Sequence, residues 1–307
     1  MTNGPAWRKG AWAQIGIWMT FAVVVSAQQI PIEQQLHIKY NSGQDVVPVF
    51  EGWERVPDGS FNMVFGYLNR NHVEELSLPV GPQNNFDPGP ADRGQPAYFY
   101  PRENHFLFRV NVPADWDKKK ELVWTVTAHG KTEQARATLL DIWEIDRKVE
   151  VSNNGGGTAV SNELVAKDQP PVIKLEAPSR ATLGTPLTIT ASVTDDGIPP
   201  PTTKKRQPRE PEPSLKSVGL PSPVNVPMPQ KPRPPQSLSV MWLVWRGPGS
   251  VSFDPDGYVK VEQGKATVKA SFTRPGTYLL RAYAHDGLLR TPADVSVVVV
   301  DGQRPSQ

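Results

Sequence analysis

The sequence predicts an all-β protein of two antiparallel, immunoglobulin-like β-sandwich domains, and three observations support this fold class. Proline accounts for 33 of the 307 residues, and proline breaks helix interiors. Short apolar runs alternate with polar residues, as in strands that have one buried face and one solvent-facing side. Turn-forming residues separate these runs at the spacing of a β-sandwich. Beyond the amino-terminal segment, the only stretch with a helical alternative is 139–149, which fits either a final strand or a short helix.

The first predicted domain spans residues 34–150. Its clearest strand is 61–69, which places Phe61, Met63, Phe65 and Tyr67 on one side and follows a Pro-Asp-Gly-Ser turn. Such alternation predicts one buried face. The other strands expected in this domain are 46–53, 74–79, 97–100, 106–112, 121–128 and 132–140.

The second predicted domain spans residues 170–301 and repeats this pattern. A linker, 151–169, precedes it and begins with the glycine-rich run SNNGGGT, which favours a flexible connection. The basic, proline-rich segment 199–235 lies between the second and third strands, so it predicts a disordered insertion within the domain. This insertion fits a solvated spacer or an electrostatic tether to acidic envelope polymers. The expected strands are 172–177, 187–193, 238–245, 251–253, 265–272, 277–284 and 294–300.

The amino terminus has the features of an export signal. Arg8 and Lys9 precede the apolar run 11–25, and Val25-Ser26-Ala27 ends it with small residues. We therefore expect a signal peptide, 1–27, cleaved after Ala27. An uncleaved membrane anchor is the main alternative, and a buried helix is a weaker one. The chain has no cysteine, which fits a bacterial protein of the periplasm or the cell exterior.

The charge of the chain argues against two classes of partner. Its formal net charge is +2, and Arg8 and Lys9 account for all of it. The remaining chain has no overall field to attract nucleic acid or an anionic membrane. We therefore expect no nucleic-acid partner, and membrane contact only through an uncleaved signal segment. The expected partner is a protein or a glycan of the cell envelope.

The second domain contains a distinctive series of aromatic and turn residues. These are Trp245, Gly247-Pro248-Gly249, Thr267, Phe272, Pro275-Gly276, Tyr278 and Asp286-Gly287. This series resembles the PKD-like, immunoglobulin-like repeats of bacterial exported proteins over residues 170–301. The resemblance implies an immunoglobulin-like sandwich, and such modules act as spacers, adhesins or binding platforms. The first domain, with the segments VFEGW, FGYLNRN and GPQNNFDPGPADRGQP, resembles a domain of uncharacterised exported bacterial proteins, which implies no activity.

The densest group of polar residues lies in the segment 69–96. Amide, carboxylate and guanidinium groups in a loop on a rigid sandwich can form a binding surface. The same groups can also cap the backbone of their own loop. Trp116 lies between two aspartates in a turn and fits either a sugar-stacking platform or a half-buried residue at a sheet edge. The candidate binding residues are Asn69, Arg70, Asn71, Asn84, Asn85, Asp87, Asp92, Arg93 and Trp116.

Calcium is the one cofactor for which the sequence offers candidate ligands. Asp195, Asp196 and Asp286 lie in Asp-Gly turns at the ends of two predicted strands, and adjacent strand ends would bring their carboxylates together. Ordinary turn chemistry is the competing interpretation, because the spacing of an EF-hand loop is absent.

Motifs typical of enzymes are missing from the sequence. It contains no G-x-S-x-G elbow, no phosphate-binding G-x-x-x-x-G-K-[ST] loop and no H-E-x-x-H pair. We therefore expect a non-enzymatic binding or structural protein of the bacterial cell envelope. A carbohydrate-binding accessory module is the first alternative and needs exposed, coplanar aromatic residues. The second is an enzyme with a loop-borne site, which needs Asp87, Asp92 and His72 within hydrogen-bond reach. The histidines stand singly, at His37, His72, His105, His129 and His285.

Overall fold

The computed structural model describes residues 40–153, 161–200, 235 and 237–302. All of these belong to one structural unit, Lys39–Gln307. The predicted signal peptide, with its expected cleavage after Ala27, lies outside the described residues. So do His37, the glycines 155–157 and nearly all of the proline-rich segment. No helix in the described part of the chain has the length and apolar character of a membrane span.

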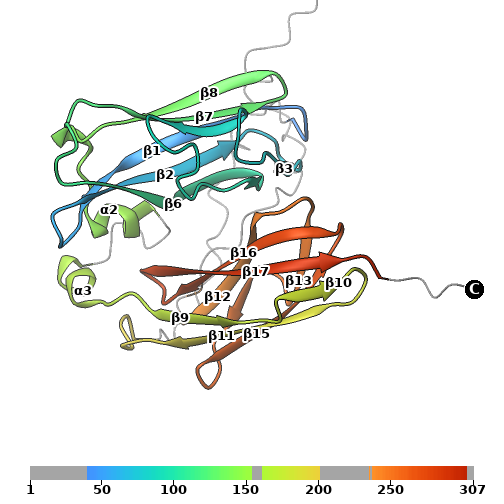
Figure 1. The fold of residues 1–307 in the computed structure, drawn as a ribbon. Coiled ribbons are helices and arrows are strands. Elements are labelled where there is room, and N and C mark those ends of the chain that lie inside the picture. The colour runs from blue at the N-terminus through green and yellow to red at the C-terminus, as the bar shows by residue number, and fades with distance from the viewer. Residues whose placement is uncertain (1–39, 154–160, 201–234, 236, 303–307) are drawn as a thin grey trace, which may run out of the picture. The chain divides into compact units, whose positions relative to one another are not determined.

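The all-β prediction is confirmed, and the first half of the chain forms a sandwich of two three-stranded sheets (Figure 1). One sheet has the strand order β1-β2-β6 and the other the order β4-β7-β8, while β3 and β5 pair separately. Every pairing is antiparallel. The strands are β1 (Val46–Arg55), β2 (Phe61–Asn69), β3 (Leu76–Ser77), β4 (Asn84–Asp87), β5 (Tyr98–Phe99), β6 (Arg102–Val112), β7 (Leu122–Ala128) and β8 (Lys131–Ala137).

Aromatic side chains from the facing sheets fill the core of this first sandwich. Phe65 of β2 meets the ring of Trp124 of β7 edge-on, with centroids 6.0 Å apart. Phe86 of β4 stacks on the same indole at 5.8 Å. Strand β7 alternates buried and half-buried residues along its length, as its sequence predicts. Strand β4 was not predicted, because its residues, Asn-Asn-Phe-Asp, lie inside the polar segment.

The second half forms a larger sandwich of two β-sheets. One sheet has the order β10-β17-β16-β12-β14 and the other the order β13-β15-β11-β9. Only the β10–β17 pair is parallel among the described strands. The sequence did not predict β10 or β14. The strands are β9 (Val172–Glu176), β10 (Arg180–Thr182), β11 (Leu187–Thr194), β12 (Ser239–Arg246), β13 (Val251–Asp254), β14 (Tyr258–Lys260), β15 (Lys265–Phe272), β16 (Gly276–His285) and β17 (Arg290–Val300).

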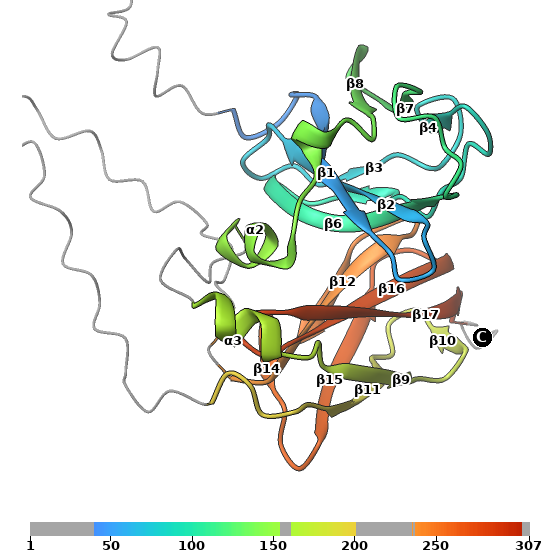
Figure 2. The ribbon, with the colours of Figure 1, turned by 90° about the vertical axis from the view of Figure 1, so that its left-hand side faces the viewer.

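Short helices occupy part of the region between the sandwiches (Figure 2). The segment 139–149, expected as a strand or a helix, contains η1 (Asp141–Trp143) and the start of α2 (Arg147–Val151). The expected flexible linker contains α3 (Asn162–Lys167), so its second part is helical rather than irregular. Ser161 caps α3 by accepting a hydrogen bond from the backbone N–H of Leu164.

The hydrophobic core of each half contains side chains that come from the other half of the chain. Trp245 and Tyr283 come from β12 and β16 but belong to the core of the first sandwich. Tyr98 of β5 belongs to the core of the second sandwich. Among the described strands, hydrogen-bonded pairing stays within each half. The two halves are therefore joined through side chains and loops rather than through a shared sheet.

Candidate functional site

Asn84, one of the predicted binding residues, is buried at the start of β4. Its side chain has no exposed surface. The amide nitrogen donates to the carbonyl oxygens of Leu78 and Pro96, at 2.9 and 2.8 Å, and the amide oxygen accepts from the indole of Trp124 at 2.9 Å. Asn84 thus supplies hydrogen bonds to backbone groups that lack partners in a sheet.

Asn69 and Asn71 form a second buried amide pair at the end of β2. Both are 0% exposed. Asn69 donates to the carbonyls of Glu74 and Phe99, and its amide oxygen accepts from the side chain and the backbone N–H of Asn71. Asn71 accepts in turn from the backbone N–H of Gln44 at 2.7 Å. A ligand at the protein surface does not reach these amides, which corrects their expected place on a binding surface.

Four other predicted residues lie nearer the surface of the same segment. Arg70 pairs with the buried carboxylate of Asp45 at 3.2 Å. Asn85 and Arg93 donate to backbone carbonyls within four or five residues of themselves. Asp87 is exposed at the end of β4. Of these four, Arg70 and Asp87 are exposed, whereas Asn85 and Arg93 are half-buried.

The carboxylate of Asp92 forms an ion pair with a side chain from the second half of the chain. Both of its carboxylate oxygens accept from the guanidinium of Arg246, at 2.7 and 2.8 Å. Arg246 also donates to the carbonyl of Gln95, and the indole N–H of Trp245 donates to the carbonyl of Gly94 at 3.0 Å. This part of the predicted binding loop therefore contacts the chain's own second sandwich. The carboxylate of Asp92 consequently lies in an ion pair rather than in a free acid–base position.

A sugar-stacking platform requires exposed tryptophan rings, and most of the tryptophans in the described residues are not exposed. Trp53, Trp124, Trp242 and Trp245 are all buried. Trp116 is half-buried, and the ammonium group of Lys120 lies 4.3 Å from the centre of its ring. Trp143 is 44% exposed, although no feature of the sequence favoured it over Trp116.

Four aspartates gather where the linker enters the second sandwich. Asp196, one of the predicted calcium ligands, is exposed and accepts from the backbone N–H groups of Gln169 and Ile198. Asp195 and Asp286, the other two predicted ligands, each keep a buried carboxylate oxygen with no hydrogen-bond partner. Asp168, which the sequence did not single out, is fully buried and has both carboxylate oxygens unpartnered.

Burial and neighbouring negative charges raise the pKa of two of these aspartates. Burial, together with the nearby charges of Asp286, Asp196 and Asp195, raises the pKa of Asp168 to about 7, although the charge of Arg147 acts in the opposite direction. Burial likewise raises the pKa of Asp286 to about 6, against the opposing effect of two backbone hydrogen bonds. No group of three or more histidine, aspartate or glutamate side chains in the described ranges forms a ready-made metal-ligand set.

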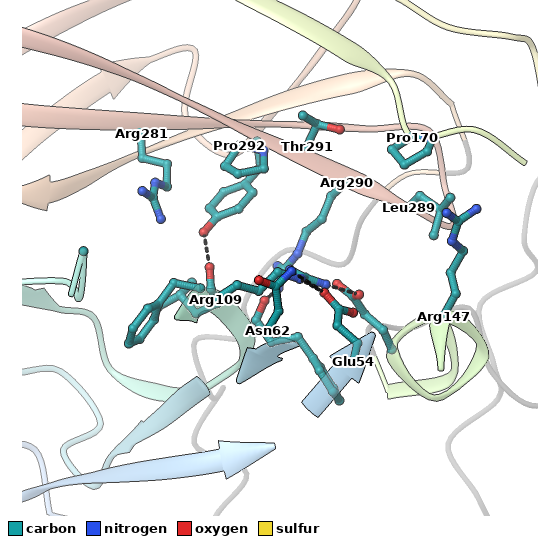
Figure 3. A pocket seen from close by; sticks show the side chains of 16 residues that line it. Glu54, Asn62, Arg109, Arg147, Pro170, Arg281, Leu289, Arg290, Thr291 and Pro292 are labelled. Carbon is teal, nitrogen blue, oxygen red and sulfur yellow. Dashed lines mark hydrogen bonds and ion pairs between the residues drawn. The ribbon is translucent and has the colours of Figure 1, made fainter. Parts of the chain in front are cut away.

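A cavity of about 550 Å³ lies between the two sandwiches (Figure 3). Its polar lining comes from strands of both halves and from α2. Arg109 of β6 bridges two carboxylates, with 2.6 Å to Glu54 of β1 and 2.6 Å to Glu150 of α2. The hydroxyl of Tyr283 in β16 donates to the carbonyl of Leu107 in β6 at 2.7 Å, and this hydrogen bond links the two halves at the cavity.

Two arginines of the cavity have no carboxylate partner among the described residues. Arg290 donates to the carbonyls of His105 and Phe106, at 2.6 and 2.7 Å. Arg147 makes one hydrogen bond, to the carbonyl of Asp168 at 2.9 Å. A backbone carbonyl leaves the positive charge of a guanidinium uncompensated. The lining has four arginines, the other two being Arg109 and Arg281, against the glutamates Glu54 and Glu150, so it is net positive.

Sequence reasoning did not identify this cavity, because its residues are spread over most of the chain. Arg147 and Arg290 are 143 positions apart, and no motif connects them. One local signal was available. Asp146 and Ser161 are helix caps, and recognition of these caps would have placed Arg147 in the first turn of a helix.

Comparisons with known proteins give a fold-level likeness only. No protein-family model matches the chain, and no curated protein matches it. A conjugative transposon lipoprotein from Bacteroides eggerthii is 9% identical, with 42% of this chain and 98% of that chain covered and a TM-score of 0.26. The PKD domain of an M14-like peptidase from a Thermoplasmatales archaeon is 12% identical, with 43% and 97% covered and a TM-score of 0.22. The D00–D0 domain of intimin is 12% identical, with 83% and 100% covered and a TM-score of 0.26.

Proposed function

We propose that the protein is an exported, non-enzymatic binding protein of the bacterial cell envelope, and that its cavity accepts a carboxylate group of an acidic glycan. The observation behind this proposal is the presence of Arg147 and Arg290 in the cavity without a carboxylate partner. A guanidinium binds a carboxylate through two parallel N–H donors. The volume of about 550 Å³ is that of a small-molecule site.

Binding is favoured over catalysis by the state of the carboxylates in the cavity. Glu54 and Glu150 both bond to Arg109, at 2.6 Å each. Both carboxylates are therefore held in ion pairs with Arg109 and are not free to act on a ligand. The residues lining the cavity include no histidine. This set of side chains is suited to holding an anion rather than transferring a proton.

The binding proposal is tested by calorimetric titration of the purified protein with oligogalacturonate and with the matched neutral galactose oligomer. We expect binding of the acidic oligomer only, weakened about tenfold or more by Arg290→Gln, since loss of a charged hydrogen bond costs about 1.5–3 kcal/mol. Arg147→Gln is the second variant, because its guanidinium is exposed and its replacement leaves the fold intact. Arg136→Gln is the control, because Arg136 is exposed on β8 and does not line the cavity.

Two results would overturn the binding proposal. One is equal affinity for the acidic and neutral oligomers. The other is unchanged affinity in both folded variants, Arg290→Gln and Arg147→Gln. A comparable loss in Arg136→Gln would show that the attraction is a general charge effect rather than recognition in the cavity.

The export part of the proposal rests on the sequence of residues 1–27 and has its own test. Fractionation of producing cells, followed by mass spectrometry of the intact protein, should find it outside the cytoplasm with Gln28 as its first residue. Recovery in the cytoplasm with residues 1–27 intact would contradict export. Recovery in the membrane with the same residues would indicate an uncleaved anchor.

A further inference from the structure

Strand β6 is the edge of its sheet, and its unpaired edge faces the cavity. In the sheet β1-β2-β6, the described strands pair with β6 on one side only, through β2. Four consecutive residues of β6, 106–109, line the cavity. An unpaired strand edge presents backbone N–H and carbonyl groups that need hydrogen-bond partners. The cavity therefore has a wall of backbone polar groups in addition to its arginine side chains.

The hydrogen bond of the Leu107 carbonyl shows which backbone groups of β6 point into the cavity. This carbonyl accepts from the hydroxyl of Tyr283, in the second half of the chain, at 2.7 Å. The N–H and carbonyl of one strand residue point to the same edge, and successive residues point to opposite edges. The N–H of Leu107 and both backbone groups of Arg109 therefore face the cavity. These three groups have no strand partner in the described chain.

An irregularity in β6 places a positive charge directly beside these groups. The register between β2 and β6 shifts in this stretch, and Phe106 has a φ of 48°, a left-handed conformation that is unfavourable for a bulky residue. The carbonyls of two consecutive residues, His105 and Phe106, both accept from Arg290, at 2.6 and 2.7 Å. The guanidinium of Arg290 is thereby held at the residue immediately before Leu107.

Arg290 keeps donors for an anion in this position. Both of its bonds to carbonyls use one nitrogen, Nη2, and do not involve Nε or Nη1. Its guanidinium carbon also lies 5.0 Å from the centre of the Tyr283 ring, which limits its movement. A carboxylate bound to Arg290 would lie close to the N–H of Leu107. The cavity therefore offers a charged donor and a neutral donor side by side.

We infer that the cavity recognises an acidic sugar that also carries an acylamino group, such as an N-acetylated uronic acid. This inference rests on the proposed binding of a carboxylate in the cavity and adds the group beside it. The carboxylate would bind Arg290, and the acyl carbonyl would accept from the N–H of Leu107. The carbonyl of Arg109 is an acceptor for a sugar hydroxyl. Leu289 and Pro292 also line the cavity and provide apolar contact for the acyl methyl group.

An extended acidic peptide is the competing occupant, because it also carries carboxylate and amide groups and can add to a strand edge. Strand addition needs a run of free backbone groups along the edge. Here the carbonyls of His105, Phe106 and Leu107 are already bound by Arg290 and Tyr283, and the irregularity at Phe106 interrupts the strand. The short free stretch that is left favours a compact sugar.

The test titrates the purified protein calorimetrically with two α-1,4-linked oligouronides of equal length that differ only at carbon 2. One is oligo-N-acetylgalactosaminuronate, and the other is oligogalacturonate, which has a hydroxyl in place of the acetamido group. We expect the N-acetylated oligomer to bind about tenfold more tightly, because it gains a hydrogen bond and buries a methyl group. Arg147→Gln should weaken binding of both oligomers and leave this preference in place.

NMR signals of the backbone amides test where the acylamino group binds. The amides of Leu107 and Arg109 should shift more with the N-acetylated oligomer than with oligogalacturonate. The amides of β8, an edge strand outside the cavity, are the control and should not shift. Leu107→Pro removes the N–H and should abolish the preference, and Leu107→Ala, which keeps the N–H, is its matched control. Should Leu107→Pro fail to fold, the wild-type amide signals decide the question.

Four results would overturn the inference, and they separate its failure from that of the binding proposal. Equal affinity for the two oligouronides overturns the inference alone, whereas failure of both to bind overturns the binding proposal as well. Tighter binding of hexaglutamate than of the N-acetylated oligomer would assign the strand edge to a peptide. A preference for the N-acetylated oligomer without shifts at Leu107 and Arg109 would place the acylamino group elsewhere.

Discussion

Replacement of Trp245 by alanine tests whether the two sandwiches stabilise each other. Trp245 is 1% exposed and lies in the core of the first sandwich although β12 belongs to the second. Its ring packs edge-on against Phe108 at 6.0 Å, and the guanidinium of Arg281 lies 3.5 Å from its centre. The substitution removes all of these contacts and the hydrogen bond to the carbonyl of Gly94.

The expected cost follows from the burial of the indole and its hydrogen bond. Truncation of a buried tryptophan to alanine costs about 3–5 kcal/mol of unfolding free energy. The hydrogen bond adds about 1 kcal/mol at most, because Gly94 is exposed and its carbonyl can bond to water instead. Trp245→Phe keeps much of the ring and should cost less than the alanine variant.

The assay is equilibrium unfolding in urea followed by circular dichroism, which does not depend on the tryptophan that is removed. The wild-type protein should unfold in one transition, and Trp245→Ala should lose stability in both halves. Trp143→Ala is the matched control, because Trp143 is 44% exposed and should cost much less. Destabilisation of Trp245→Ala by less than about 1 kcal/mol, or by no more than the control, would refute the reasoning.

Two further predictions concern single side chains. Asn84→Ala removes the donors to the Leu78 and Pro96 carbonyls and the acceptor for the Trp124 indole. We therefore expect the free energy of unfolding, measured in urea, to fall by about 2–5 kcal/mol. An Asn84→Ala variant as stable as the wild-type protein would contradict this expectation. The pKa of His105 is raised, chiefly by its hydrogen bond to Glu51 at 2.9 Å. Its contribution to stability should therefore be complete below the ordinary histidine pKa and disappear as the pH rises through the raised value. NMR titration should find that Glu51→Gln lowers the pKa of His105, and an unchanged value would contradict the assignment.

The strands that the sequence predicts best are those whose residues alternate in polarity. The segment 61–69 coincides with β2, and 121–128 differs from β7 by one residue. In β7 buried and half-buried residues alternate, so burial imposes a period of two on the sequence. The central residues of β2, Met63–Tyr67, are instead buried on both faces, which corrects the single buried face expected there. Strand β4 lacks this signal. It is a strand because it pairs with β7, where Phe86 lies opposite Trp124 and stacks on its ring, and these residues are far apart in the chain.

The candidate sites were harder to predict because they depend on contacts between distant segments. Asp92 was a reasonable candidate for ligand binding until the structure placed Arg246, 154 positions away, against its carboxylate. Asp195 and Asp286 were grouped as candidate calcium ligands from their positions at strand ends, and this grouping stays a prediction. Asp168 had no such signal, because it lies in a segment that appeared to be a linker, and only the helix α3 brings it to the cluster.

The exchange of side chains between the two cores has a consequence for how this protein can be altered by recombination. Trp245 and Tyr283 fill space in the first sandwich, and Tyr98 fills space in the second. A gene fusion that replaces either half with a foreign β-sandwich removes these rings and leaves holes in the half that is kept. The two halves therefore have to be inherited, expressed and engineered together, and a fragment cut between them would expose apolar surface that invites aggregation.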